Sequence, residues 1–187
     1  MSDDLRDGIL SLNTRQFGTV IELMVQLLKD YKNSENLEFD LYDPHTNEKI
    51  EVKSSRAYKK QTLKLSLDTL YEIIINNSNR KRLLKQKQAL ESDFNCNIQQ
   101  VKIAYFDKLY YVLLFYDVIE IFMIYAKDIK KDTMIGYSDK QHRGNYGEGQ
   151  FHITQKNYQH HKDNYFIQSM TYADIKAILL KRKNRKA

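Results

Sequence analysis

The sequence predicts an α/β (α+β) fold in which a central mixed β-sheet is flanked by helices. Two patterns support this class. Stretches with apolar residues at helical spacing stand near both ends of the chain, and β-rich runs separated by short turns stand between them. The 187 residues contain no internal repeat and no break in composition, so we expect one domain over residues 1–187.

The first helix is expected over residues 12–30, where apolar residues recur at helical spacing and Thr14 stands at the N-cap position. The strongly basic stretch SNRKRLLKQKQALESD, residues 78–93, is also typical of a helix. Its apolar anchors are Leu83, Leu84 and Leu90. Further helices are expected over residues 67–77 and 171–186, the second with Thr171 as its N-cap.

Two strands of alternating polarity are predicted over residues 37–43 and 48–55, joined by the turn PHTN. Ile50 and Val52 alternate with charged residues on the second strand, so we expect them to face the core. Three more β-rich runs follow over residues 98–106, 110–117 and 119–126. The polar stretch 136–150 contains several glycines and is predicted to be a loop, followed by a short strand over residues 151–154.

The charge balance is modestly basic, with 30 Lys and Arg residues against 24 Asp and Glu residues and a net charge of +6. This excess favours a phosphate-rich partner, because each neutralised phosphate releases counterions, although an ordinary basic soluble protein has the same balance. Cys96 is the only cysteine, so an internal disulfide or a cysteine-rich zinc site is excluded. No apolar run approaches the roughly 18 residues of a membrane span. The acidic start does not match a secretory signal, so we expect a cytoplasmic protein.

The two strands beside PHTN form a predicted hairpin with a defined register. With Asp43 opposite Glu48 at the turn, Asp40 falls opposite Glu51. Lys53 lies two residues beyond Glu51 and therefore shares its face of the strand. The aliphatic residues between them turn the other way. The sequence thus places two carboxylates and one ammonium group on a common surface.

These three groups suggest a chemistry. Two carboxylates that face each other repel unless a cation neutralises them, and Mg²⁺ needs only one or two protein carboxylates when phosphate oxygens and water complete its shell. A lysine beside the metal can position or deprotonate the attacking water and balance charge in the transition state. The hairpin over residues 37–55 therefore has the groups for metal-assisted phosphodiester hydrolysis. The alternative is a solvent-facing hairpin in which Lys53 makes an ordinary charge pair with Glu51.

The segments FD and IEVKSSRA resemble the motif of the PD-(D/E)XK nuclease superfamily, an aspartate on one strand and Glu-x-Lys on the next. The resemblance implies that Asp40 and Glu51 bind Mg²⁺, with Mn²⁺ as a substitute, and that Lys53 assists the nucleophilic water. The segment FGTVIELM resembles the first core helix of that family, in which Glu22 would complete the metal site. The family's proline before the aspartate is missing. Asp43 is an alternative to Asp40 as the first acid of the motif, but it belongs to the turn and would face away from Glu51.

The order of elements around this hairpin resembles that of small Type II restriction endonucleases. The resemblance implies a restriction-endonuclease-like fold and cleavage of double-stranded DNA at a specific short sequence, leaving 5′-phosphate and 3′-hydroxyl ends. A homodimer is expected if the site is palindromic, because a two-fold protein matches a two-fold site. A DNA methyltransferase is expected as a genomic partner and not as a bound subunit. The alternatives are a nicking or repair nuclease or a junction resolvase on the same fold, or a DNA-binding protein without turnover.

Candidate DNA contacts fall in three stretches: directly after the motif, in the basic segment 78–90, and in the segment 136–165. Hydroxyl and basic groups suit phosphates, whereas arginine and carboxamide side chains suit base edges. For each position the alternative is an ordinary solvated surface residue. The candidates are Ser54, Ser55, Arg56, Arg80, Lys81, Arg82, Gln141, Arg143, Asn145, Gln150 and His152.

The histidines of the C-terminal third allow one other type of nuclease. The segment FHITQKNYQHH contains the residue types of a His-Asn-His nuclease, which needs a histidine base, a structuring asparagine and a ligand histidine on a ββα unit. The strand and loop pattern fits that unit poorly, and the paired cysteine sites that often accompany it are absent from the sequence. Solvated or phosphate-contacting histidines are therefore the preferred interpretation.

Overall fold

A computed structural model describes residues 2–60, 63–76, 79–141 and 146–184 of the chain. The helices are α1 (Ser2–Ser11), α2 (Thr14–Lys29), α3 (Leu70–Asn76), α4 (Asn79–Arg82), α5 (Ala126–Ile129), α6 (Tyr158–Asn164) and α7 (Tyr172–Asn184), with short 3-10 turns η1 (Gln86–Gln88), η2 (Ile103–Tyr105) and η3 (Thr133–Ile135). The strands are β1 (Lys32–Asn33), β2 (Leu41–Tyr42), β3 (Lys49–Arg56), β4 (Tyr58–Lys59), β5 (Phe94–Val101), β6 (Lys108–Leu114), β7 (Val118–Tyr125), β8 (Ser138–Lys140), β9 (Tyr146–Thr154) and β10 (Phe166–Thr171).

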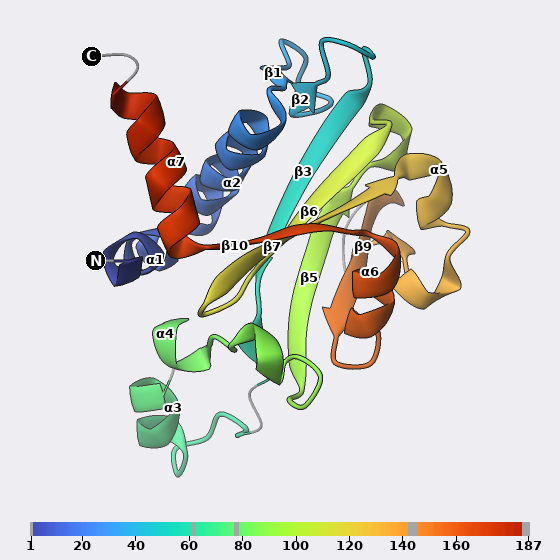
Figure 1. Ribbon diagram of the computed structural model, residues 1–187. Helices are drawn as coiled ribbons and strands as arrows, with labels where there is room; N and C mark the ends of the chain where they lie inside the picture. The colour runs from blue at the N-terminus through green and yellow to red at the C-terminus, as the bar shows by residue number, and fades with distance from the viewer. Residues whose placement is uncertain (1, 61–62, 77–78, 142–145, 185–187) are drawn as a thin grey trace.

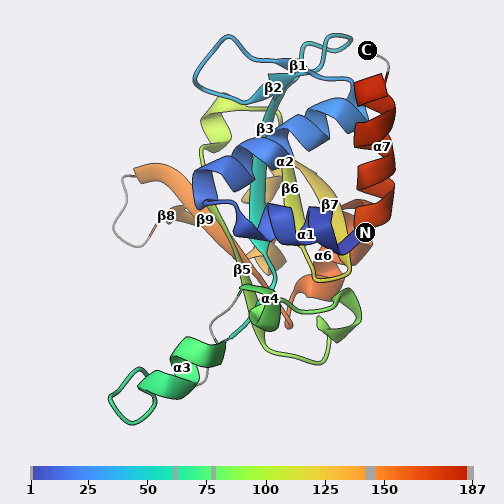
Figure 2. The same ribbon diagram turned by 90° about the vertical axis from the view of Figure 1, so that its left-hand side faces the viewer.

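The described strands form two sheets. The larger has the order β1–β2–β3–β6–β7–β10, in which β3 and β6 are parallel and the other neighbours antiparallel, and the smaller has the order β4–β5–β9–β8. Helices α1, α2 and α7 lie together on one side of the larger sheet, and β5 and β9 lie on the other (Figure 1; turned by 90° in Figure 2). The predicted class, a mixed sheet flanked by helices, is confirmed.

Two apolar cores lie on the two faces of the larger sheet. Because side chains alternate along a strand, Val112 of β6 points into the core beneath the helices, whereas Tyr111 and Leu113 point into the core shared with the smaller sheet. Ile50 and Val52 of β3 are buried in the helix-side core, as predicted. The central strands are therefore covered on both sides, which fixes the position of β3 within the molecule.

Side chains cap the two long helices at their N-termini. Asn13 caps α2 by accepting a hydrogen bond from the N–H of Gln16 at 2.9 Å, so the predicted cap at Thr14 is wrong by one residue. Thr171 caps α7, as predicted. Its hydroxyl accepts from the N–H of Asp174 at 3.2 Å, and the Asp174 carboxylate accepts from the N–H of Thr171 at 2.9 Å.

The hairpin has the predicted register, but its first strand is short. The N–H of Asp43 donates to the carbonyl of Glu48 at 3.0 Å, and Leu41 pairs with Ile50. Strand β2 has only 2 residues, so the strand predicted over 37–43 is too long. The preceding residues instead form a loop on the surface, and this leaves most of β3 without a neighbour on that side.

The basic stretch 78–93 is not the continuous helix that the sequence predicts. After the short α4, the N–H of Leu84 donates to the carbonyl of Ala57 at 2.9 Å, and the carbonyl of Leu84 accepts from the N–H of Tyr116 at 2.7 Å. These bonds to other parts of the fold replace the helical ones. Leu84 is fully buried, whereas Leu90, a predicted anchor, is 50 % exposed.

The predicted loop over 136–150 is largely a β-hairpin. Strands β8 and β9 pair through Ser138 and Gln150. Strand β9 continues to Thr154 and so includes the short strand predicted over residues 151–154. Residues 142–145 lie outside the described residues. The hairpin forms because β5 offers a partner edge and because Phe151 and Ile153 are buried in the core between the sheets.

The segment that carries α3 stands away from the body of the protein (Figures 1 and 2). Its helix falls within the predicted range 67–77 and has no buried residue among those described. Large apolar side chains are exposed along it, namely Leu63, Leu65, Leu67, Leu70, Tyr71, Ile74 and Ile75. Among the described helices, none is both long and apolar enough to cross a membrane.

Phe94 should be a main contributor to the core between the sheets, because its ring is fully buried and meets Phe115 and Tyr158 edge-on, with centroids 6.4 and 6.0 Å apart. We expect Phe94→Ala to lower the free energy of unfolding by about 3–5 kcal/mol, since it removes the ring and leaves a cavity. Urea unfolding followed by circular dichroism measures the change. The control Leu37→Ala alters a fully exposed side chain and should change stability by less than about 0.5 kcal/mol. Equal losses would contradict this core.

Candidate active site

Asp40 lies just before β2, where β3 loses its strand partner. The N–H of Asp40 donates to the carbonyl of Ile50 at 3.1 Å and continues the β2–β3 ladder by one residue. The N–H of Val52 is directed to the same edge, because backbone groups alternate along a strand, and it donates to Oδ2 of Asp40 at 2.8 Å. The Asp40 side chain thus takes the place of the missing strand, which holds its carboxylate at the edge of the sheet.

Glu51 and Lys53 lie on the face of β3 opposite Ile50 and Val52, which are buried beneath the helices. Oε1 of Glu51 and Nζ of Lys53 form an ion pair. The Glu51 side chain is 9 % exposed and the Lys53 side chain 22 % exposed. The pair therefore holds the lysine ammonium at the boundary between the protein interior and solvent.

Helix α2 brings Glu22 to the same place. Glu22 follows the fully buried Ile21, so it lies at the border of the helix face that packs on the sheet. It lines an open cleft of about 790 Å³ together with Lys53, and a smaller recess of about 310 Å³ together with Asp40. Glu22 is thus the carboxylate common to both hollows. The structure brings together the four residues, Glu22, Asp40, Glu51 and Lys53, that the sequence assigned to one site.

The carboxylates of the site oppose one another's ionisation. Burial raises the pKa of Glu51 to about 7; the Lys53 ammonium acts against this rise, and the carboxylates of Asp40 and Glu22 add to it. Burial also raises the pKa of Glu22, with a further upward contribution from Asp40 and an opposing one from Lys53. Acids that resist ionisation in this way would be stabilised by a bound cation.

The donor set suits a small divalent cation. Val52 occupies one oxygen of Asp40 and Lys53 occupies one oxygen of Glu51, so each acid has a second oxygen without a hydrogen bond from any described residue. Hard oxygen donors are the ligands that Mg²⁺ prefers. Within the described residues, no group of three or more Asp, Glu, His or Cys side chains forms a ready-made metal cage. This arrangement fits an ion held by one or two carboxylates and completed by water and phosphate.

Four elements form the walls of the cleft beside Lys53: the N-terminal half of α2, the C-terminal half of β3, β4 through Tyr58, and β5. The contribution of β5 consists of Asn95, Asn97, Gln99 and Gln100, which are not among the site residues predicted from the sequence. The signal for them was present in FNCNIQQV, where asparagine and glutamine alternate with apolar residues. Alternation shows which residues share a face of a strand, but only the packing of the two sheets shows that this face borders the motif.

Ser54 and Ser55 also line the cleft. Their contacts with phosphates stay a prediction. Arg56 lines the cleft too, but its guanidinium is engaged within the protein. The guanidinium carbon lies 3.9 Å from the centre of the Phe17 ring, and Nη2 donates to the carbonyl of Leu12 at 3.0 Å. Arg56 therefore fastens the start of α2 to β3, and its contact with a phosphate stays a prediction.

The basic residues of α4 lie near one end of β3 (Figure 1). The guanidinium of Arg82 lies 4.8 Å from the centre of the ring of Tyr58, which lines the cleft. Lys81 Nζ donates to the carbonyl of Ile75 at 2.9 Å. Arg80 belongs to α4, but its side chain is outside the described part of the structure. Positive charge thus flanks the cleft at this end.

The candidate base-reading residues of the C-terminal third are spread over β8 and β9. Arg143 and Asn145 lie outside the described residues. Gln141 directly follows β8, and Gln150 on β9 is only 7 % exposed. The register of β9 with β5 places Gln150 and His152 on the face of the smaller sheet that borders the cleft. These two positions are therefore closer to the site than their distance in the sequence indicates.

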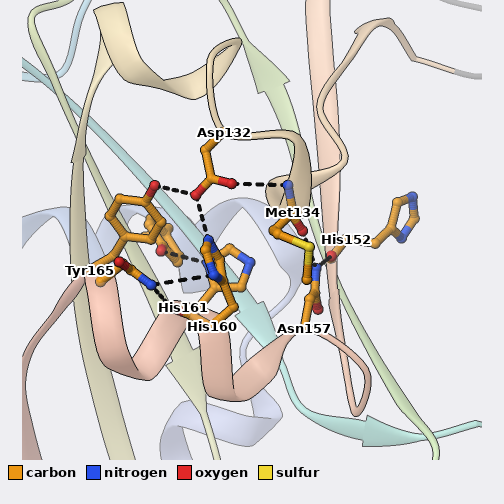
Figure 3. A network of polar contacts seen from close by, with 9 residues as sticks. Asp132, Met134, His152, Asn157, His160, His161 and Tyr165 are labelled. Atoms are coloured by element: carbon orange, nitrogen blue, oxygen red, sulfur yellow. Dashed lines mark hydrogen bonds and ion pairs between the residues drawn. The ribbon is translucent and has the colours of Figure 1, made fainter.

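A second polar network joins η3 to α6 (Figure 3). Oδ2 of Asp132 accepts from the hydroxyl of Tyr165 and bonds to Nε2 of His160, both at 2.5 Å. Oδ1 of Asp132 accepts from the N–H of Met134 at 2.9 Å. The Asp132 carboxylate thus holds the η3 turn against α6 and Tyr165. These bonds give Asp132, His160 and Tyr165 a structural role.

The histidines do not converge as a His-Asn-His nuclease requires. His161 is fully buried against Tyr111, and burial lowers its pKa to about 4, so it is neutral near pH 7. The ring of His152 points away from the Asp132 network, to the other side of β9 (Figure 3). Asn157 donates to the carbonyl of His152 at 2.9 Å and holds the turn before α6. Among the described residues, the histidines thus serve separate contacts.

Comparison of the chain with known protein families, with curated proteins and with solved structures found no match. The resemblance of the hairpin to the PD-(D/E)XK motif stays a hypothesis. The interpretation of the site rests on its own residues: a carboxylate fixed by Val52, a buried glutamate paired with Lys53, and a third carboxylate presented by α2.

The burial of Glu51 predicts a stability that depends on pH. Its pKa rises from an ordinary 4.5 to about 7 on folding, so the folded state keeps this proton where the unfolded state loses it. The stability that the protonated group contributes is complete below about pH 4.5 and is lost as the pH rises through about 7. We expect Glu51→Gln to raise the free energy of unfolding at pH 8 by roughly 1–3 kcal/mol, and by much less at pH 5. Urea unfolding at the two pH values measures this.

Glu48→Gln is the matched control on the same hairpin. Its carboxylate is more exposed and accepts from Nζ of Lys108 at 2.5 Å, and this bond lowers the pKa of Glu48. Removing its charge should leave stability at pH 8 unchanged or reduce it. Equal stabilisation by both variants would point to the net charge of the protein and not to the burial of Glu51.

Proposed function

We propose that the protein is a Mg²⁺-dependent endodeoxyribonuclease that cleaves double-stranded DNA at a specific short sequence, as a Type II restriction enzyme does. One observation carries the proposal. Asp40, Glu51 and Lys53 meet Glu22 at the open edge of β3, beside a polar cleft. The combination of clustered acids, one lysine and an open polar surface suits the hydrolysis of a phosphodiester better than it suits an ordinary surface hairpin.

In the proposed reaction, water attacks phosphorus in line with the leaving oxygen. A new O–P bond forms, the P–O3′ bond breaks, and the proton that the water loses is delivered through solvent to the 3′ oxygen. The products are a 5′-phosphate and a 3′-hydroxyl. Lys53 positions the water and balances the negative charge at phosphorus, since its ammonium lies where the protein meets the cleft.

Asp40 and Glu51 would hold Mg²⁺, and Mn²⁺ would substitute for it. The resemblance gives Glu22 as a further ligand, but the described acids form no group of three that could hold a metal ion, so Glu22 would act through a water of the ion. When bound, the ion supplies Lewis-acid neutralisation of charge at the phosphate. The chain's own part is to hold these acids in place. Val52 fixes Asp40, the ion pair with Lys53 fixes Glu51, and α2 presents Glu22.

Positive charge on the protein would hold the DNA. The net charge of +6 and the basic helix α4 beside the cleft favour a polyanionic substrate. A homodimer belongs to the proposal, because two copies of the site would cut both strands of a palindrome. A cytoplasmic location and a DNA methyltransferase as genomic partner complete it.

Lys53→Ala should abolish cleavage while leaving DNA binding largely intact, because the ammonium acts on the water and the phosphorus. We expect the wild-type protein to convert supercoiled plasmid to discrete linear bands in Mg²⁺. The rate should fall by about 100-fold or more in Lys53→Ala and in Glu51→Ala. Gel electrophoresis of a time course measures cleavage, and a gel shift without Mg²⁺ measures binding.

Lys130→Ala is the matched control, since Lys130 pairs with Asp139 outside the lining of the cleft. It should cut at the wild-type rate. Open circles in place of linear bands would favour a nicking or repair nuclease or a junction resolvase. Binding without any product would favour a DNA-binding protein without turnover. Normal cutting by both Lys53→Ala and Glu51→Ala would show that the site is wrong.

Mg²⁺ binding should strengthen between pH 6 and pH 8, because the ion competes with the proton of Glu51, whose pKa is about 7. Calorimetric titration of the DNA-free protein with Mg²⁺, in buffers of different ionisation enthalpy, should show release of up to about one proton per ion near pH 7. The pH dependence should weaken in Glu51→Gln, where Glu22 still titrates with a raised pKa, and persist in full in Glu48→Gln. Binding that is independent of pH in the wild-type protein would contradict the role of Glu51.

A further inference from the structure

One face of β5 is lined with carboxamides. Asn95, Asn97 and Gln99 alternate with the buried residues of the opposite face and line the cleft together with Gln100. Asparagine is disfavoured in strands. Two asparagines in alternation therefore lower the stability of the strand, and the packing of the core does not explain their presence. The segment Phe94–Val101 contains no lysine or arginine, which makes this face unsuited to phosphates and suited to neutral polar groups.

Most of these side chains lack partners within the protein. No hydrogen bond joins the carboxamides of Asn97, Gln99 or Gln100 to any described residue, and Oδ1 of Asn97 is buried. Some carboxamides elsewhere are engaged: Gln86 and Asn157, for example, each donate to a neighbouring oxygen at 2.9 Å. Since buried polar groups in proteins normally have a partner, the buried oxygen of Asn97 points to a partner outside the chain, whereas Gln99 and Gln100 are exposed and available to bind one.

A β-bulge turns one more carboxamide toward the cleft. The register of β5 with β9 shifts between Gln99 and Val101, and Gln100 between them takes a left-handed backbone conformation, φ 56°. Gln99 and Gln100 are both exposed as a result, although consecutive residues of a regular strand face opposite sides. Bulges beside active sites commonly re-aim a side chain in this way.

Strand β9 extends the polar face. Gln150 lies opposite Gln99, and His152 lies opposite Asn97. Oε1 of Gln150 is buried without a hydrogen-bond partner among the described residues. His152 is engaged, because its Nδ1 lies 2.8 Å from Oδ1 of Asn95. Gln150 is therefore enclosed beside the face, and the carboxamides that line the cleft come from β5.

We propose that this carboxamide face, formed by Asn97, Gln99 and Gln100 of β5, reads base edges of the DNA held in the cleft and prefers adenine. The inference rests on the proposed function. In the major groove a carboxamide accepts from the N6 amino group of adenine and donates to N7, which no other base offers in that pattern. The exposed carboxamides of Gln99 and Gln100 provide both halves of this contact, and Asn97 provides the donor.

The spacing along the strand agrees with this role. Same-face residues of a strand lie about 6.8 Å apart, two steps of about 3.4 Å, and successive bases of one DNA strand are also about 3.4 Å apart. Alternate residues such as Asn97 and Gln99 therefore match every second base pair. Strand β5 lies inside the smaller sheet, between β4 and β9, so its cleft-lining face, and not an open strand edge, would meet the base edges.

The test is selection of bound sequences from a randomised duplex pool, carried out with Lys53→Ala protein so that no DNA is cut. We expect enrichment of A·T pairs at defined positions. Adding Asn97→Ala or Gln99→Ala should reduce the preference about 10-fold at one or two positions. Adding Asn97→Asp or Gln99→Glu should shift the preference toward cytosine, because a carboxylate accepts from the cytosine amino group but cannot donate to N7.

Gln159→Ala is the control, because its carboxamide lies on α6 and donates to Asp163 at 2.7 Å; its selected sequences should match those of the Lys53→Ala parent. Thermal unfolding by circular dichroism identifies any variant that is misfolded. A pool bound without preference, or a preference unchanged in all four variants, would overturn the inference while plasmid cleavage could still support the nuclease. Absence of any DNA binding by the Lys53→Ala and wild-type proteins would overturn both proposals.

Discussion

The site depends on the difference in length between two neighbouring strands. Strand β2 ends after 2 residues, whereas β3 continues to Arg56. Among the described strands, none pairs with the far part of β3 on that side. An open strand edge normally invites pairing with another chain. Here the carboxylate of Asp40 takes one of the free N–H groups, and α2 and β5 enclose the rest as a polar cleft.

The environment of Glu51 at this edge opposes the ionisation of its carboxyl group. Glu51 is buried, with Lys53 as its one direct side-chain partner among the described residues and two further carboxylates nearby, and its pKa rises to about 7. Glu120 is the contrasting case. It is buried more deeply, at 1 % exposed, but Tyr158 donates to one of its oxygens at 2.6 Å and Lys162 to the other at 2.8 Å. A satisfied carboxylate serves the fold, whereas an under-satisfied one among like charges is typical of a functional site.

Local patterns were reliable where residues close in sequence decide the structure. The turn fixes the pairing of Asp43 with Glu48, so the position of Asp40 beside β3 followed from spacing alone. The same reasoning failed for the stretch 78–93. There, helical propensity predicts a continuous helix, but Leu84 bonds to backbone groups of two distant segments. Tertiary hydrogen bonds and burial outweigh propensities of a few tenths of a kcal/mol per residue.

The sequence by itself determined the class of fold, the register of the hairpin and the residues of the acidic motif, because each depends on alternation or turn geometry over a few residues. Only the tertiary structure decided that Glu22 joins these acids, that Arg56 is engaged with Phe17, and that β5 lines the cleft. These facts depend on the packing of segments that are far apart along the chain. Spacing in a sequence carries no information about which distant surfaces come to face each other.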